Sequence, residues 1–218
     1  MKIKFKKYWR KTGIKNTEDA EFLLKHIEKI KPKNFLEIGV FHGVTSRNVC
    51  EILHLLHGYD FKFTGIDMFL DDNDIKALKK DEYLPNYTFS NPLKTLYYKH
   101  IIKSDPYSLE SVNKLLNKFK KNVNIIKGNS NEVLKEINLD GIDYVFLDGG
   151  HKYETVRNDL ENLTQIVNNN GIILCDDYDL SYAPGIKKAI DEYVLSKNYN
   201  LKILNSRFAE ITKKFHNL

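Results

Sequence analysis

Short apolar runs alternate with longer amphipathic segments along most of the chain, and the two patterns predict different elements. The runs typical of buried strands cover residues 34–38, 61–66, 123–126, 144–147, 172–175, 201–204 and 208–211. Apolar residues at helical spacing lie between them, over residues 17–30, 45–56, 112–119, 133–137, 153–167 and 186–195. Only Asn205, Ser206 and Arg207 join the last two strands, a link too short for a parallel pair. The pattern therefore predicts an α/β fold: a doubly wound, mostly parallel seven-stranded sheet with a C-terminal antiparallel hairpin.

The regular alternation loosens between residues 68 and 121. Pro85, Pro92 and Pro106 interrupt this stretch, and aromatic residues are dense in it. A structureless connection of that length is unusual in a compact domain, so we expect a helical insertion or lid. The expected organisation is a basic N-terminal arm over residues 1–16 and a single domain over residues 17–218, with the insertion at about 68–121.

The positive charge is concentrated at the N-terminus. The first 15 residues carry seven basic side chains and no acid, whereas the other 203 carry 27 basic and 29 acidic ones. Such an arm has two interpretations, a contact with nucleic acid or another acidic surface, and a solubilising tail. The tail is the simpler interpretation.

The chain has the composition of a soluble globular protein. No apolar run is long enough to span a bilayer, and the N-terminus lacks the apolar core of a signal peptide. Cys50 and Cys175 are the only cysteines, and both lie inside apolar patterns. We expect buried thiols in a reducing compartment, a cytoplasmic location and no membrane partner.

Acidic residues follow two of the predicted strands. Residues 145–147 lead into Asp148, two glycines and His151, and residues 172–175 lead into Asp176 and Asp177. If these strands are neighbours, about 4.8 Å apart, three carboxylates and an imidazole meet at one edge of the sheet. Carboxylate oxygens suit Mg²⁺, Mn²⁺ or Ca²⁺ better than zinc. The alternative is that the acids are ordinary turn residues and the histidine is structural. We favour a metal site with His151 as a general base.

The loop after the first strand is rich in glycine. Glu37, Gly39 and Gly43 form the pattern E-x-G-x-x-x-G, and Phe41 stands where a dinucleotide fold needs its second glycine. A pyrophosphate has little room there, which disfavours a nicotinamide cofactor. The pattern instead resembles motif I of class I methyltransferases that use S-adenosylmethionine. The carboxylate of that ligand suits the helix N-terminus that begins near Thr45.

Two further strand ends carry candidate ligand contacts. Asp67 ends the second strand, where an acid can accept hydrogen bonds from both ribose hydroxyls. Asn129 and Ser130 follow the third strand and are candidates for contact with adenine. The alternatives are a helix cap or a solvent-facing carboxylate at Asp67, and N-capping by Ser130.

Several of these segments together resemble the macrocin O-methyltransferase type, a metal-dependent class I group that methylates hydroxyls on sugars. The resembling segments are F-L-E-I-G, T-G-I-D, V-F-L-D-G-G-H-x-Y-E-x-V-x-x-D-L and G-x-I-I-L-C-D-D-Y, and they cover most of residues 34–178. The resemblance implies that Asp148, Asp176 and Asp177 hold Mg²⁺ and that His151 takes the hydroxyl proton. It also implies a methyl-donor site whose residues are Glu37, Gly39, Val40, Phe41, Gly43, Thr45, Asp67, Met68, Asn129, Ser130 and Asp148.

The expected function is therefore S-adenosylmethionine- and Mg²⁺-dependent O-methylation of a small hydroxylated molecule, with a saccharide as the expected acceptor. The sequence leaves open whether the protein forms a homo-oligomer. One alternative is a methyltransferase fold that acts on nucleic acid, which the basic arm suggests. The sequence Asp-Gly-Gly-His disfavours it, because amino-methylating enzymes of that kind usually carry Asn/Asp-Pro-Pro-aromatic there. A second alternative is a non-catalytic binding protein that keeps the fold.

Overall fold

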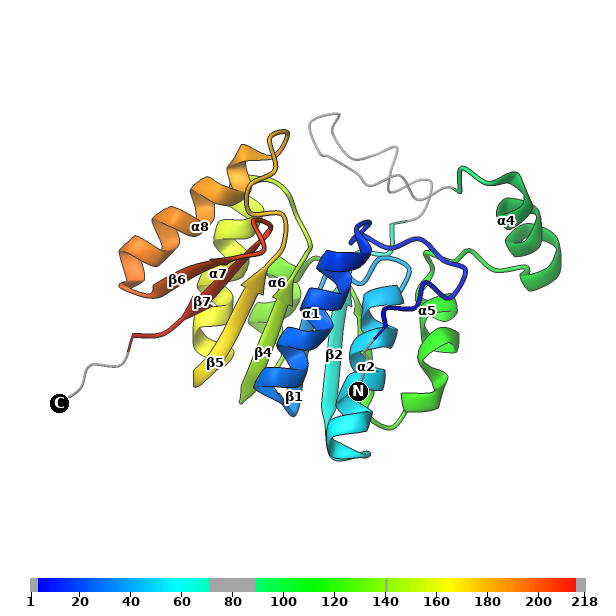
Figure 1. Ribbon diagram of the computed structural model, residues 1–218, viewed down its shortest axis with the longest axis horizontal. Coiled ribbons are helices and arrows are strands. Elements are labelled where there is room, and N and C mark those ends of the chain that lie inside the picture. The colour runs from blue at the N-terminus through cyan, green and yellow to red at the C-terminus, as the bar shows by residue number, and fades with distance from the viewer. Residues whose placement is uncertain (1–3, 71–88, 140, 215–218) are drawn as a thin grey trace.

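The computed structural model describes residues 4–70, 89–139 and 141–214. One seven-stranded sheet runs through these residues in the order β3-β2-β1-β4-β5-β7-β6 (Figure 1). Its strands are β1 (Asn34–Ile38), β2 (Lys62–Asp67), β3 (Val123–Lys127), β4 (Ile142–Leu147), β5 (Val167–Cys175), β6 (Asn200–Leu204) and β7 (Phe208–Thr212). Neighbouring strands from β3 to β5 pair in parallel, and β7 pairs antiparallel with both β5 and β6. The predicted fold class is confirmed.

Helices cover both faces of the sheet (Figure 1). The helices α1 (Thr17–Ile30), α2 (Val44–His57) and α5 (Leu109–Leu116) share one core with the sheet, and α7 (Tyr153–Ile166) and α8 (Pro184–Lys197) share the other with the short α6 (Ser130–Glu136). Successive strand residues alternate between these cores. Phe35, for example, stacks on Phe63 and Tyr144 at centroid distances of 5.6 and 5.0 Å, while Leu36 faces the other core. Burial on both faces explains why the strands read as continuous apolar runs.

Asparagine side chains cap the start of two helices. The N-cap of α1 is Asn16, whose side chain accepts a hydrogen bond from the Glu18 backbone at 2.9 Å, so Thr17 is already helical. The N-cap of α6 is Asn129 rather than Ser130, because the Asn129 side chain accepts from a backbone amide in the first turn. Asparagine and serine are equally good caps, so composition alone did not separate the two positions.

The described part of the segment from 68 to 121 is made of helices and the loops between them. It contains α4 (Pro92–Leu96), the π-helix η1 (Tyr97–Ile102), α5 and the 3-10 helix η2 (Asn117–Phe119). Figure 1 shows α4 set apart from the sheet, whereas α5 lies against it. The core contacts of α5 come from Val112 and Leu116. The part of the predicted lid at residues 71–88, with Pro85, lies outside the described residues.

Residues 4–16 pack on the domain. The backbone of Lys6 pairs with the side chain of Asn48 in α2, at 2.9 and 2.8 Å. Arg10 is buried, and Ile14 is completely buried in the core that α1 and α2 share with the sheet. This segment is therefore part of the folded domain, unlike the solvated tail that its charge suggested. Within the described ranges, no helix combines the length and the apolar character needed to cross a membrane.

Candidate active site

The register of β4 and β5 places their following acids side by side. Leu147 pairs with Cys175, and the backbone N–H of Asp176 donates to the Leu147 carbonyl at 2.9 Å. Asp148 follows β4 directly, and its own N–H donates to the Ile38 carbonyl of β1 at 2.8 Å. These bonds fix the two strand ends at one edge of the sheet.

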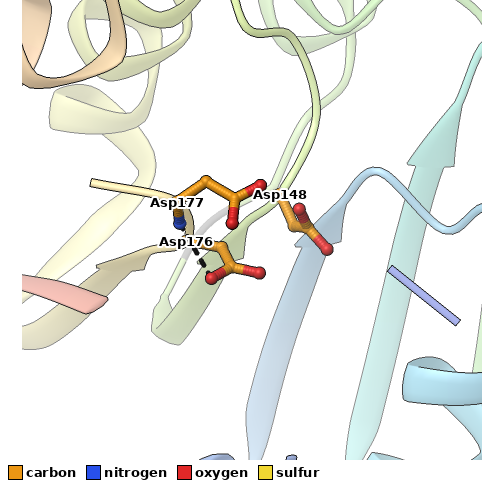
Figure 2. Close-up of side chains that lie close together, drawn as sticks. All are labelled: Asp148, Asp176 and Asp177. Atoms are coloured by element: carbon orange, nitrogen blue, oxygen red, sulfur yellow. Dashed lines mark hydrogen bonds between the residues drawn. The ribbon is translucent and has the colours of Figure 1, made fainter. Parts of the chain in front are cut away.

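Three carboxylates meet at that edge (Figure 2). Asp148, Asp176 and Asp177 each offer one oxygen, and these oxygens all lie within 4.8 Å of one another. A divalent cation such as Mg²⁺ needs oxygen ligands about 2.1 Å from its centre, so ligand oxygens lie at most about 4.2 Å apart across it. Small side-chain rotations are enough to bring the three oxygens to that spacing.

Arg207 is a site residue that the sequence analysis missed. It begins the return from the β6–β7 turn, and its Nε and Nη2 donate to the two oxygens of Asp176, the second at 2.7 Å. Its Nη2 also lies 2.8 Å from Asp177 Oδ1. One guanidinium thus contacts two of the three acids. With all groups ionised, the cluster keeps a net charge of −2, which one divalent cation neutralises.

The electrostatics of the acids fit a bound cation. Burial raises the pKa of Asp148 well above its ordinary value, and the charges of Asp176 and Asp177 raise it further. Burial also raises the pKa of Asp176, although the hydrogen bond from Arg207 opposes the rise. Burial is the main cause of both shifts, because it disfavours the charged form of a carboxylate. The donor set and its charge therefore suit a hard divalent cation.

His151 lies beside the acids. Its Nε2 is 3.4 Å from Asp177 Oδ2, a distance at which the imidazole and the carboxylate interact electrostatically. Both groups line a small cavity at the carboxyl ends of β4 and β5, together with Leu147, Asp148, Gly149, Gly150, Val156, Cys175, Asp176 and Ile186. The predicted base thus opens onto the same space as the three acids.

The glycine loop runs against this centre. Gly39 has a φ of +95°, and a Cβ at this position would lie 2.0 Å from the backbone oxygen of Asp148. Glycine is required here because the end of β1 approaches β4 so closely. Gly43, with a φ of +73°, is the N-cap residue of α2, and Thr45 is buried in the first turn of that helix. The side chain of Val40 lies in the hydrophobic core, so only its backbone faces the loop.

Asp67 lies at the end of β2, across the loop. Its Oδ2 accepts from the Phe41 backbone N–H at 2.7 Å, and its Oδ1 accepts from the Phe69 N–H and the Tyr107 hydroxyl, each at 2.9 Å. Burial raises the pKa of Asp67, and these hydrogen bonds oppose the rise. Tyr107, which was not predicted as a site residue, therefore donates to the acid expected to bind ribose. Met68, the next residue, is 38% exposed.

Glu37 lies under the loop and is fully buried. One of its oxygens accepts a hydrogen bond from the Ser46 hydroxyl, and Oε1 has no hydrogen-bond partner in the described part of the chain. Burial raises its pKa to about 8, although the Ser46 bond opposes the rise. Burial therefore favours the protonated, neutral form of Glu37.

Asn129 and Ser130 lie at the end of β3, on the same edge of the sheet as the other predicted donor residues. The Asn129 side chain is engaged as the helix cap. The neighbouring Asn131 donates to Asp159 of α7 at 2.6 Å. Burial raises the pKa of Asp159 to about 7, against the lowering effect of hydrogen bonds from Ser130 and Asn131. The structure thus connects this loop to α7, the helix that follows His151.

Known proteins match this chain in sequence and in fold. A family model described as a methyltransferase domain matches residues 36–178. An uncharacterized protein of Acanthamoeba polyphaga mimivirus is 39% identical over 56 residues, so the match spans only 25% of this chain and 25% of that curated relative.

Two solved structures have the same fold at low identity. The SAH-bound methyltransferase PaMTH1 of Podospora anserina superimposes with a TM-score of 0.62 at 15% identity, covering 93% of this chain and 80% of its own. A TDP-rhamnose 3′-O-methyltransferase of calicheamicin biosynthesis gives a TM-score of 0.58 at 14% identity, covering 89% and 78%. The chain therefore belongs to the methyltransferase-domain family, and its fold is that of S-adenosylmethionine-dependent O-methyltransferases.

Proposed function

We propose that this protein transfers a methyl group from S-adenosylmethionine to a hydroxyl oxygen of a small molecule, and that a divalent cation, Mg²⁺ in the first instance, assists. The convergence of Asp148, Asp176 and Asp177 beside His151 carries the proposal. The three acids would hold the cation, and the edge formed by the ends of β1, β2 and β3 would hold the donor.

The chemistry explains why both a cation and a base are useful. Methyl transfer from a sulfonium is an in-line displacement, which requires the oxygen to lie behind the methyl carbon. An alcohol is a poor nucleophile because it holds its proton tightly, and a bound cation supplies the positive charge that lowers the pKa of such a hydroxyl. His151 Nε2, 3.4 Å from Asp177, is placed to take the proton.

A saccharide is the acceptor class that we propose. Sugar hydroxyls are far weaker acids than phenols, so they gain most from a cation and a base acting together. The TDP-rhamnose 3′-O-methyltransferase, which has the same fold, acts on a sugar nucleotide by its name. Both points favour a glycoside or sugar nucleotide over a phenolic acceptor.

The test is incubation with S-adenosylmethionine and a panel of sugars, sugar nucleotides and phenols, with Mg²⁺ or with a chelator. The expected result is a single-methyl mass gain on one sugar that disappears with chelator and in Asp148→Asn. Asp60→Asn is the matched control, because Asp60 is exposed and forms an exposed ion pair with Lys33. A gain that survives both chelator and Asp148→Asn would remove the cation from the proposal, and a gain confined to phenols would overturn the acceptor class.

A further inference from the structure

The N-terminal segment crosses the proposed reaction centre. A methyl group added to Gly13 would lie 3.0 Å from Asp148 Oδ2, and among the described residues the carboxylate of Asp148 is the only group within 4 Å of that position. Gly13 itself is exposed, so its backbone lies between Asp148 and solvent. Its φ is outside the left-handed region, which means that larger residues fit the backbone without strain. A side chain at position 13 would therefore fill the space beside Asp148, one of the proposed cation ligands.

Arg10 fixes this segment from one side. Its buried guanidinium donates four hydrogen bonds, to the His42 carbonyl at 3.1 Å, the Pro106 carbonyl at 3.0 Å, and the Ser111 carbonyl and hydroxyl at 2.9 and 2.8 Å. The acceptors belong to the glycine loop and to the start of α5. The planar guanidinium group of Arg10 thus joins the N-terminal segment to two elements that border the candidate site.

Ile14 fixes the segment from the other side, because its side chain is completely buried in the core. Lys11, Thr12 and Gly13 therefore span the distance between two anchored residues. Thr12 adds an independent observation: its hydroxyl oxygen is buried and has no hydrogen-bond partner among the described residues. A buried hydroxyl without a partner is unfavourable, and a bound ligand is one way to satisfy it.

We propose that residues 11–13, held by Arg10 and Ile14, cover the carboxylate of Asp148 on the side of Gly13, and that Gly13 determines how closely a cation and its acceptor approach that carboxylate. The inference rests on the proposed function, since it assigns a role in the same site. Arg10 is a positioning residue in it, and Gly13 is a specificity-determining one. Residues 10–14 of the basic N-terminal arm are then part of the site.

Mn²⁺ binding measured by calorimetry on the full chain tests Gly13 without any need for turnover. Gly13→Val is expected to lower Mn²⁺ affinity at least about tenfold, because the added methyl groups press on Asp148 Oδ2, while the thermal unfolding midpoint stays unchanged. Lys15→Ala, at an exposed position in the same segment, is the matched control and should bind as the wild type does. Equal Mn²⁺ affinity in Gly13→Val and wild type would refute the proposed role of Gly13. Absence of Mn²⁺ binding by the wild type would instead refute the proposed cation site.

Hydrogen exchange tests the anchor independently of any ligand. Arg10→Lys keeps the charge but cannot make the four bonds of the guanidinium group, so the amides of residues 9–14 should exchange at least about tenfold faster. Those of β1 and β4 should keep their protection. Mn²⁺ affinity should fall in parallel. Unchanged exchange over residues 9–14 would show that Arg10 does not hold the segment and would refute its positioning role.

Discussion

Arg207 and Asp176 form the tightest ion pair of the candidate site, with two hydrogen bonds between one guanidinium and one carboxylate. The Asp176 side chain is fully buried in this pair, and 21% of Arg207 is exposed. The pair neutralises one of three clustered acids and leaves a charge that a divalent cation matches. Arg207 therefore supports the acid cluster without a cation and leaves two of its three negative charges uncompensated.

Removing Arg207 should make the protein depend on the cation. Arg207→Met leaves three acids without a counter-charge, and breaking a buried pair in this way costs about 3–5 kcal/mol of folding free energy. We expect Mg²⁺ to raise the unfolding temperature of this variant more than that of wild type, because the three acids then carry a larger negative charge for the cation to offset. Thermal unfolding with Mg²⁺ or with chelator measures the difference. Lys114→Met, which breaks an exposed pair, should cost only about 0.3–0.5 kcal/mol and respond to Mg²⁺ as wild type does.

The buried Glu37 should make the stability depend on pH. Its pKa is about 8 in the folded protein against 4.5 for an ordinary glutamate, so the folded state keeps a proton that the unfolded chain has lost. The stability from this group is complete below pH 4.5 and is lost as the pH rises to about 8, at about 1.4 kcal/mol per pH unit.

Glu37→Gln replaces the titrating carboxyl group with a neutral amide. Between pH 5 and pH 8 the free energy of unfolding of this variant should therefore fall less steeply than that of wild type. Urea denaturation across this range measures the slope. Glu136→Gln, at an exposed position near the end of α6, is the control and should keep the wild-type slope. Parallel slopes for Glu37→Gln and wild type would mean that Glu37 is ionised in the folded protein.

Alanine substitutions at two glycines should distinguish the cost of a steric clash from the cost of backbone strain. Gly39 and Gly58 both have positive φ, but a Cβ at Gly58 meets nothing within 4 Å, whereas at Gly39 it meets the Asp148 carbonyl at 2.0 Å. Gly58→Ala should therefore cost about 1–3 kcal/mol, because alanine is strained at the φ of +63° and ψ of −127° that Gly58 adopts. Gly39→Ala should cost more than about 4 kcal/mol, because β1 and β4 must separate. Urea denaturation of both variants decides the matter, and equal losses would contradict the close approach.

The fold and the acid cluster were predictable because they follow from local patterns. Continuous apolar runs mark strands buried on both faces, and parallel strands end at one edge, so Asp148 and Asp176 had to be close if β4 and β5 were neighbours. The short link at residues 205–207 required the antiparallel pair that the structure has. These inferences need only residues near each other in sequence and one assumption about strand order.

The missed residues depend on contacts between distant parts of the chain. Arg207 reaches Asp176 because β7 pairs antiparallel with β5, with Ala209 opposite Cys175. Finding Arg207 from the sequence would have required this register, because Arg207 precedes Ala209 by two residues and therefore lies beside the end of β5. Gly13 and Tyr107 gave no comparable sign, because neither the path of the N-terminal segment nor that of residues 103–108 follows from periodicity.

The hydroxyl of Tyr107 should compete with the ligand for Asp67. It donates to Asp67 Oδ1, the acid predicted to accept the ribose hydroxyls of the donor. Tyr107→Phe removes that donor and leaves an oxygen of Asp67 available, so the affinity for S-adenosylhomocysteine should rise a few-fold, at a cost of about 1 kcal/mol in stability. Asp67→Asn should lower the affinity at least about tenfold, because hydrogen bonds to a charged acceptor are worth about 1.5–3 kcal/mol each. Calorimetric titration of both variants makes the comparison. A loss of affinity in Tyr107→Phe as large as that in Asp67→Asn would show instead that the tyrosine holds Asp67 in its binding orientation, and that the two residues act on the ligand together.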